Sequence, residues 1–245
     1  MTGELFSYFP ICHRNIPVNY RKLPSIVRLG ILISERFILT AAHCVVRDDR
    51  KLPSIVRLGK IDLLGDSDNA TAQDIPVEER IIHPEYKSYK LGKDIALLRL
   101  ARTAEFNDNV KAVCLNTSPQ IRSRLLISGW GLINRTTEQR SRFLQRAIME
   151  PYDLNKCNQT FLESPSRIAI YDAQLCALSN APAPSSTCKG DSGGPIQFEN
   201  RRNDGRTPMI VAGITSYGRG CRGSVPTIYT RVSSYLSWIE EIVWR

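Results

Sequence analysis

Gly190-Asp191-Ser192-Gly193-Gly194-Pro195 is the stretch of this chain that decides the fold, because Ser192 stands in it as a candidate nucleophile. A serine hydroxyl is a poor nucleophile at neutral pH, so it needs a neighbouring base and a carboxylate that orients that base. The segment Thr40-Ala41-Ala42-His43-Cys44 supplies a histidine, and Asp94 opens the apolar segment Asp94-Ile95-Ala96-Leu97-Leu98-Arg99-Leu100. The candidate residues therefore occur in the order His43, Asp94 and Ser192.

That order excludes one class of fold. Gly190-x-Ser192-x-Gly194 also matches the nucleophile elbow of the α/β-hydrolases, in which the serine comes first and the histidine last. The histidines of this chain are His13, His43 and His83, and none of them follows Ser192. An α/β-hydrolase is therefore excluded.

Four further motifs lie between or after the segments that contain His43, Asp94 and Ser192. They are His83-Pro84-x-Tyr86, Gly129-Trp130-Gly131, Ser216-Tyr217-Gly218 and Pro226-Thr227-Ile228-Tyr229-Thr230-Arg231-Val232. With the first three segments, they resemble the trypsin-like (chymotrypsin-fold) serine peptidases over about residues 31 to 245. The resemblance implies an all-β fold of two antiparallel six-stranded Greek-key β-barrels with a C-terminal α-helix. His43 and Asp94 would lie on the first barrel and Ser192 on the second.

Hydrophobic periodicity predicts short strands between turns, which is typical of barrels. The predicted strands are residues 30–34, 36–40, 54–58, 95–100, 125–128, 208–216 and 227–232. Apolar residues from Tyr235 to Val243 recur at helical spacing behind Ser233 and Ser234, which are candidate caps. The chain should therefore end in a helix.

Composition limits the partners of this chain. It has 245 residues and a formal net charge of +9, enough length for a two-barrel unit with a sizeable core. The basic residues are scattered, and the loosest cluster is Arg122, Arg124, Arg135, Arg140, Arg142 and Arg146. We therefore expect no nucleic-acid partner, no membrane association and a monomer.

The cysteines indicate an oxidising compartment. There are seven, and none has the Cys-x-x-Cys spacing of a zinc site, so disulfides are favoured. Sequons at Asn69, Asn116, Asn134 and Asn158 also indicate an extracellular protein. The family resemblance implies the disulfides Cys157–Cys176 and Cys188–Cys221, the second beside the substrate pocket.

The resemblance assigns a catalytic role to each motif. His43 would be the general base and Asp94 would hold its tautomer, while Ser216 would orient Asp94. The amides of Gly190 and Ser192 would form the oxyanion hole, where each donor lowers the barrier by roughly 3 kcal/mol. Gly190 is required because a side chain would crowd the incoming carbonyl.

The same alignment predicts the specificity pocket. Ser186 would lie at its base, where a trypsin carries aspartate, so Arg and Lys side chains would find no counter-charge. Ser216, Tyr217 and Gly218 would form one wall, and Thr227 would reduce the depth of the pocket. The residue before the scissile bond should therefore be apolar and of medium size, such as Leu, with His as an alternative.

Asp191 and the N-terminal segment are the parts of the chain that would convert an inactive precursor into an active peptidase. In the family, the equivalent carboxylate pairs with a new N-terminal ammonium after cleavage before an Ile/Val-Val-Gly-Gly sequence. We find no such sequence and no signal peptide near Met1, so Asp191 is expected to stay unpaired unless another group replaces the ammonium. We divide the chain into an atypical segment 1–30 and a peptidase domain 31–245.

The decapeptide Arg-Lys-Leu-Pro-Ser-Ile-Val-Arg-Leu-Gly occurs twice, at residues 21–30 and 50–59. We interpret the first copy as a duplication or an assembly error, not as part of a repeat array. It places Arg28 where the family has the cysteine that bonds to Cys44. Cys114 stands where arthropod clip-domain proteases tether the catalytic domain, so we hypothesise a Cys12–Cys114 bond.

The leading prediction is a secreted serine endopeptidase resembling clip-domain proteases of immune or developmental cascades. Leu125 and Phe198 support this subgroup, since they replace two cysteines bonded to each other in many vertebrate members. The expected partners are protein substrates, a serpin inhibitor and an upstream activating protease.

We expect no cofactor and no metal. A calcium site is disfavoured because Lys60 stands where calcium-binding relatives have a carboxylate. Oxygen ligands for calcium are nevertheless present nearby, at Asp62, Asp66, Asp68 and Asp74. Two other functions stay open. One is a non-catalytic or zymogen-locked homologue with a regulatory role, and the other is a cationic heparin- or surface-binding protein.

Overall fold

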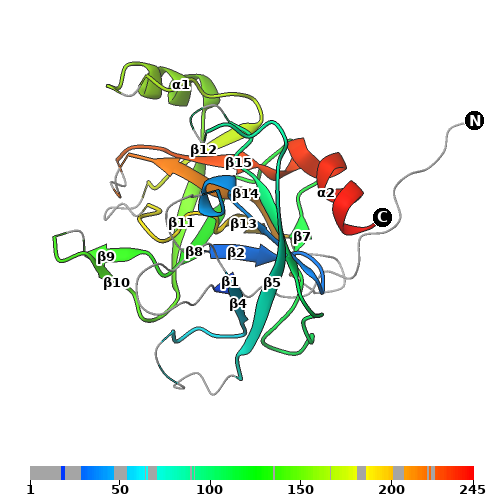
Figure 1. Ribbon diagram of the computed structural model, residues 1–245. Coiled ribbons are helices and arrows are strands. Elements are labelled where there is room, and N and C mark those ends of the chain that lie inside the picture. Colours follow the sequence, from blue (N-terminus) through cyan, green and yellow to red (C-terminus); the bar gives the residue numbers. More distant parts are fainter. Residues whose placement is uncertain are drawn as a thin grey trace, which may run out of the picture.

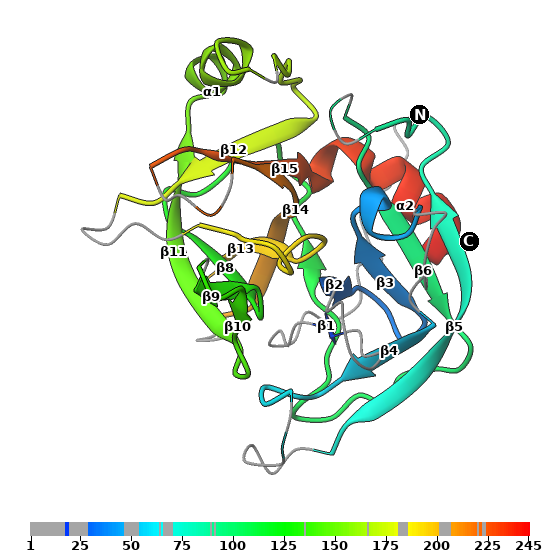
Figure 2. The same ribbon diagram turned by 60° about the vertical axis from the view of Figure 1, so that its left-hand side comes forward.

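The structure is a computed structural model that describes residues 18–19, 29–46, 54–63, 65, 71–88, 90, 92–134, 136–165, 167–180, 186–200, 207–219, 221 and 224–245. It is mainly β-structure, with two groups of strands packed side by side (Figures 1 and 2). The predicted atypical segment 1–30, which contains the first decapeptide copy, lies largely outside the described residues.

The first group of strands is a closed barrel in the order β1-β2-β3-β6-β5-β4. Its strands are β1 (Val18–Asn19), β2 (Leu29–Leu32), β3 (Phe37–Thr40), β4 (Ile55–Leu58), β5 (Gln73–Ile82) and β6 (Ala96–Leu100). β3 and β6 are buried along most of their length and pair antiparallel, with Thr40 opposite Ala96. This register brings the end of β3 and the start of β6 together.

The second group is a sheet in the order β13-β8-β11-β12-β15-β14-β7, and a further antiparallel pairing of β13 with β14 joins its two sides. The strands are β7 (Cys114–Leu115), β8 (Leu125–Gly129), β11 (Gln145–Tyr152), β12 (Gln174–Leu178), β13 (Pro195–Glu199), β14 (Met209–Gly218) and β15 (Thr227–Arg231). A separate small hairpin consists of β9 (Leu132–Asn134) and β10 (Gln139–Arg140).

Two α-helices accompany the strands. α1 (Leu154–Leu162) projects beside the second group of strands, and α2 (Leu236–Val243) follows a 3₁₀ turn, η3 (Val232–Tyr235) (Figure 1). α2 packs near His83, whose ring lies 5.4 Å from the ring of Tyr235 and 5.2 Å from that of Trp238. Burial lowers the pKa of His83, and the charge of Lys93 lowers it further. The His83 motif is thus explained by packing.

The predicted fold class is confirmed, and the structure adds elements that periodicity did not predict. The sequence analysis missed α1 and the strands β1, β5, β7, β9, β10, β11, β12 and β13. At least half of the residues of β5 and β11 are exposed, so these strands lack a clear apolar alternation, whereas β12 and β13 are mostly buried. The prediction of Ser233 and Ser234 as helix caps is wrong, because neither η3 nor α2 has a side-chain cap and both serines lie within η3.

Contacts between the two groups of strands hold the site. The indole Nε1 of the fully buried Trp130 donates to the carbonyl oxygen of Ile61 at 3.0 Å. Arg142 forms two hydrogen bonds of 2.6 Å to the carboxylate of Asp62, which has no exposed surface. These interactions fix the first barrel against the loops that surround Ser192.

None of the helices in the described part of the chain is long and apolar enough to cross a bilayer.

Candidate active site

His43 and Asp94 meet because of the β3–β6 pairing. His43 lies in a short 3₁₀ turn, η1 (Ala42–Cys44), directly after β3, and Asp94 stands two residues before β6. The Nδ1 of His43 lies 2.7 Å from Oδ2 of Asp94, and the backbone amide of His43 donates to Oδ1 at 2.9 Å. Asp94 is fully buried, so the imidazole is held by a carboxylate that solvent does not screen.

The second group of strands completes the surroundings of Asp94. Ser216 Oγ donates to Oδ2 of Asp94 at 2.5 Å, and Thr230 Oγ1 donates to the backbone carbonyl of Asp94 at 2.8 Å. Ser216 lies on β14 and Thr230 on β15, so one residue of the first barrel is fixed by two strands of the second. Hydrogen bonds to a carboxylate stabilise its charged form.

The second ring nitrogen of His43 contacts a thiol. The Nε2 of His43 lies 3.6 Å from Sγ of Cys44, which is buried and not disulfide-bonded. Burial by itself lowers the pKa of His43, but the charge of Cys44 and the hydrogen bond to Asp94 outweigh it and raise this pKa to about 11. These interactions therefore favour the charged form of the imidazole.

Ser192 lies in a tight loop whose shape needs glycine. Gly190 has φ +107° and Gly193 has φ +81°, both in the left-handed region. A Cβ on Gly193 would lie 2.3 Å from Oγ1 of Thr40 and 2.4 Å from the carbonyl oxygen of Leu29. The amide of Leu29 also donates to the carbonyl of Ser192 at 3.2 Å, which ties the loop to the first barrel.

Ser192 and His43 line one cavity of about 490 Å³. Within the described residues, Ser192 Oγ makes no hydrogen bond to His43, whose Nε2 faces Cys44. Hydrogen bonds between catalytic groups are often long without substrate. The described residues also offer no hydrogen-bond acceptor to the amides of Gly190 and Ser192, so both donors are available to a bound group.

Asp191 points away from this cavity and under the Gly129-Trp130-Gly131 segment. Its Oδ1 accepts from the amide of Gly131 and its Oδ2 from that of Cys188, both at 2.8 Å. A Cβ on Gly131 would lie 2.4 Å from Oδ2 and one on Gly129 would lie 2.0 Å from Oδ1. The glycines of this motif are therefore required by the approach of the carboxylate.

Arg140 is the cation that acts on Asp191. Burial raises the pKa of the Asp191 carboxyl, while the hydrogen bonds from Cys188 and Gly131 and the charge of Arg140 offset part of the rise. Arg140 Nη1 is buried without a hydrogen-bond partner among the described residues, and a Cβ on Gly190 would lie 2.6 Å from it. This guanidinium thus lies close to Gly190 in the loop that carries Ser192, and its charge acts on the Asp191 carboxylate.

The structure divides the predicted pocket residues between two cavities. Ser216, Tyr217 and Gly218 line the cavity of Ser192. Ser186 instead lines a neighbouring cavity of about 340 Å³ together with Asp191. Thr227 lines neither cavity, and a Cβ on Gly218 would lie 3.4 Å from its Oγ1. The buried Thr227 side chain therefore packs behind the Gly218 wall.

The geometry can be compared with that of known proteins. The chain matches the family model described as Trypsin over residues 22–239. This chain belongs to the trypsin family. Its structure is similar to a chain of neuropsin, a serine protease expressed in the limbic system of mouse brain, with a TM-score of 0.74, 30% identity and 92% coverage of each chain.

Several relatives in the trypsin family come from arthropods. Identity is 40% to the serine protease Hayan and 36% to the serine protease snk of Drosophila melanogaster, over 88% of this chain in each case. The identity to phenoloxidase-activating factor 3 of Holotrichia diomphalia is 36%, over 87% of this chain. The chain spans 34%, 49% and 63% of these relatives in turn. The predicted resemblance to arthropod clip-domain proteases is thereby confirmed.

The disulfides of this trypsin-family chain surround the second group of strands. Cys157 is bonded to Cys176, and Cys188 is bonded to Cys221 at the edge of the Ser192 cavity. Cys114 is also disulfide-bonded, whereas the hypothesis that names Cys12 lies outside the described residues.

Metal ligands do not gather in the described part of the chain, where no group of three or more His, Cys, Asp or Glu residues could hold an ion. Asp66 and Asp68 of the candidate calcium loop lie outside that part.

Sequence reasoning missed three residues of the trypsin-family site. Thr230 was quoted within a motif but given no role, and Arg140 was named only as a member of the loose basic cluster. The contact of Cys44 with Nε2 of His43 was also not foreseen. The Thr-Arg-Val end of its motif could have indicated a role for Thr230 in the site. No sequence pattern indicated such a role for Arg140, which reaches the site only through the β9–β10 hairpin.

Proposed function

We propose that this chain is a serine endopeptidase that hydrolyses peptide bonds of protein substrates through an acyl-enzyme on Ser192. The observation that carries the proposal is the fully buried carboxylate of Asp94, whose Oδ2 lies 2.7 Å from Nδ1 of His43 and accepts from Ser216 at 2.5 Å. This arrangement fixes the tautomer of an imidazole that lines the same cavity as a serine.

Each step has a residue to perform it. Nε2 of His43 takes the proton of Ser192 as Oγ attacks the substrate carbonyl, and it then gives that proton to the leaving amine. The amides of Gly190 and Ser192 stabilise the oxyanion. A water molecule then attacks the acyl-enzyme, with His43 again acting as the base.

The cavity walls support a preference for apolar residues of medium size before the scissile bond. Ser216, Tyr217 and Gly218 border the cavity, and the described lining holds no carboxylate that could pair with a substrate Arg or Lys. An unpaired cation buried there would be costly.

The relatives support a place in an extracellular proteolytic cascade. Their names include a melanization protease of Drosophila melanogaster and a clotting factor subunit of Tachypleus tridentatus. The disulfides Cys157–Cys176 and Cys188–Cys221 support secretion, because such bonds persist in oxidising compartments. An upstream activating protease and a serpin inhibitor are proposed as its partners, and residues 31–245 as the peptidase domain.

A second candidate function is that of a zymogen-locked or non-catalytic homologue. The contact of His43 Nε2 with Cys44 Sγ at 3.6 Å favours it, because the pKa of His43 raised to about 11 leaves little neutral imidazole to accept the Ser192 proton.

Labelling with a fluorophosphonate probe tests both candidates, because the probe reports an assembled nucleophile whatever the substrate. We expect labelling of the 245-residue chain that is lost in Ser192→Ala. If the unmodified chain is not labelled between pH 6 and pH 10, the endopeptidase proposal fails and the homologue reading replaces it.

A further inference from the structure

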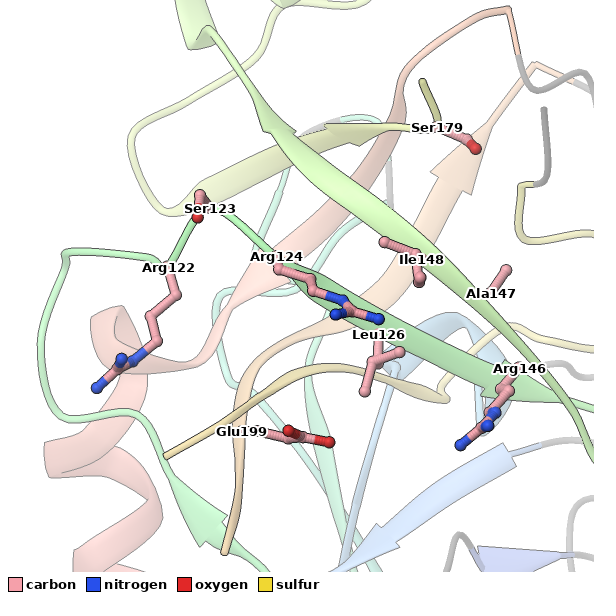
Figure 3. A pocket seen from close by; sticks show the side chains of 9 residues that line it. All are labelled: Arg122, Ser123, Arg124, Leu126, Arg146, Ala147, Ile148, Ser179 and Glu199. Carbon is pink, nitrogen blue, oxygen red and sulfur yellow. The ribbon is translucent and has the colours of Figure 1, made fainter. Parts of the chain in front are cut away.

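The outer face of the second group of strands carries a concave surface that shares no lining residue with the Ser192 cavity. It has a volume of about 710 Å³ and is lined by Arg122, Ser123, Arg124, Leu126, Arg146, Ala147, Ile148, Ser179 and Glu199 (Figure 3). We call it the β8–β11 groove, because most of these residues belong to or adjoin those two strands.

The strand register orders the side chains of this groove. β8 and β11 are antiparallel, with Leu126 opposite Ile148 and Ser128 opposite Arg146. Side chains two residues apart share a face, and so do direct cross-strand partners. Arg124, Leu126, Arg146 and Ile148 therefore share the outward face. In Figure 3 the two apolar side chains lie between the two arginines.

Neither of these arginines is neutralised by the described residues. Arg124 and Arg146 are exposed and form no ion pair or side-chain hydrogen bond with any of them. Arg122 differs, because its Nη2 donates to Asn200 Oδ1 at 2.9 Å and its guanidinium lies over the ring of Phe198. The groove thus presents two available guanidinium groups, one towards each end.

The middle of the groove is apolar and accessible. The Ile148 side chain is 47% exposed, and Leu126 opposite it is half-buried. The carboxylate of Glu199 also lines the groove, and the β13–β8 register, with Gln197 opposite Leu126, places it beside Arg124. This carboxylate would repel a uniformly charged polyanion. Charge complementarity therefore favours a ligand with two separate negative charges and an apolar group between them.

We propose that the β8–β11 groove binds an extended acidic peptide segment of a partner protein, with the pattern acidic-x-apolar-x-acidic. Arg124 directly precedes β8 and lies four positions before Ser128, the residue opposite Arg146, a separation of about 13 Å along a strand. An extended peptide spans the same length between residues i and i+4, and residue i+2 faces the same side. Its carboxylates would pair with Arg124 and Arg146, and its apolar side chain would cover Leu126 and Ile148.

The probe is a fluorescein-labelled peptide, Glu-Ser-Leu-Ser-Glu, blocked at its C-terminus. Its binding to the Ser192→Ala chain is followed by fluorescence polarisation, so that turnover is not required and the result does not depend on the proposed peptidase activity. We expect saturable binding with Kd below about 1 mM. Arg124→Ser and Arg146→Ser should each raise Kd about fivefold, as expected for loss of one exposed ion pair.

Arg167→Ser is the matched control. Arg167 is exposed and follows α1, so this substitution removes the same charge at a position outside the groove. It should leave Kd unchanged within about twofold. Glu→Gln at both peptide ends removes both ion pairs and should raise Kd about 25-fold. A shortened peptide, Glu-Ser-Leu-Glu, should bind more weakly because its second carboxylate faces the other side.

Two outcomes would overturn the proposal. One is the absence of saturable peptide binding. The other is that a heparin-derived oligosaccharide binds in place of the peptide and loses affinity in the Arg124 and Arg146 variants, which would make the groove a glycan site.

Discussion

The Sγ of Cys44 lies 3.6 Å from the Nε2 of His43, the nitrogen that has to face Ser192 for catalysis. The charge of Cys44 is the largest contribution that raises the pKa of His43, against the opposing effect of burial. The contact with Cys44 therefore favours the charged form of the imidazole.

Cys44→Ala should move the rise of kcat/KM with pH to lower pH. A raised pKa keeps His43 charged below that pKa, and only neutral imidazole can accept a proton, so activity increases with pH. Removing the thiol removes part of the rise in pKa, and activity at neutral pH should increase about ten- to a hundredfold. The measurement is the fluorophosphonate labelling rate between pH 6 and pH 11, with Cys44→Ser as a second variant. An unchanged profile in both would show that the thiol has no influence on His43.

Ser216→Ala should lower kcat/KM by about ten- to a hundredfold, because a hydrogen bond to a buried carboxylate contributes about 1.5–3 kcal/mol. Ser216 Oγ donates to the same oxygen of Asp94 that His43 contacts. Steady-state kinetics on an apolar peptide substrate would measure it. The loss should appear in kcat, and a change confined to KM would contradict this positioning role.

Arg140→Gln should lower stability more at pH 8 than at pH 4. Burial raises the pKa of Asp191, so ionisation of this carboxyl costs stability as pH rises through its folded pKa, and Arg140 offsets part of that cost. We expect a loss of about 1 kcal/mol at pH 8, measured by urea denaturation.

The control for this measurement is the double variant Arg140→Gln, Asp191→Asn. With no carboxyl left to ionise, its stability relative to Asp191→Asn should not depend on pH. An equal effect of Arg140→Gln at both pH values would show that its charge does not act on Asp191.

Thr227→Gly should extend the substrate preference towards aromatic residues. Thr227 packs behind Gly218, and its loss would open the wall between the Ser192 cavity and the interior. We expect the ratio of kcat/KM for Phe over Leu before the scissile bond to rise about tenfold. A series of fluorogenic peptides measures it. If the ratio stays constant, another residue sets the depth of the cavity.

Trp130→Phe should destabilise the protein by about 2–4 kcal/mol. The change removes the indole donor to the carbonyl of Ile61 and leaves a gap at a fully buried position between the two groups of strands. Urea denaturation gives the value, and Trp238→Phe, at a partly buried position on α2, serves as the comparison. Equal midpoints for Trp130→Phe and the unmodified chain would contradict the role of this contact.

Much of the fold could be predicted from local patterns because buried strands such as β3 and β6 are continuous apolar segments. β5 and β11 escaped prediction because at least half of their residues are exposed and their polar and apolar residues do not alternate regularly. Pairing with buried neighbours places such segments in the sheet, and this pairing is a long-range property that periodicity does not contain.

The sequence by itself determined the membership of this chain in the trypsin family and the positions of His43, Asp94 and Ser192, because each motif is a short run of neighbouring residues. Only the tertiary structure decided what these residues touch. Ser216 reaches Asp94 across 122 positions and Arg142 reaches Asp62 across 80. The Cys44 contact, the place of Arg140 and the division of the pocket residues between two cavities depend on side-chain directions and on the packing of the two groups of strands, which only the folded chain fixes.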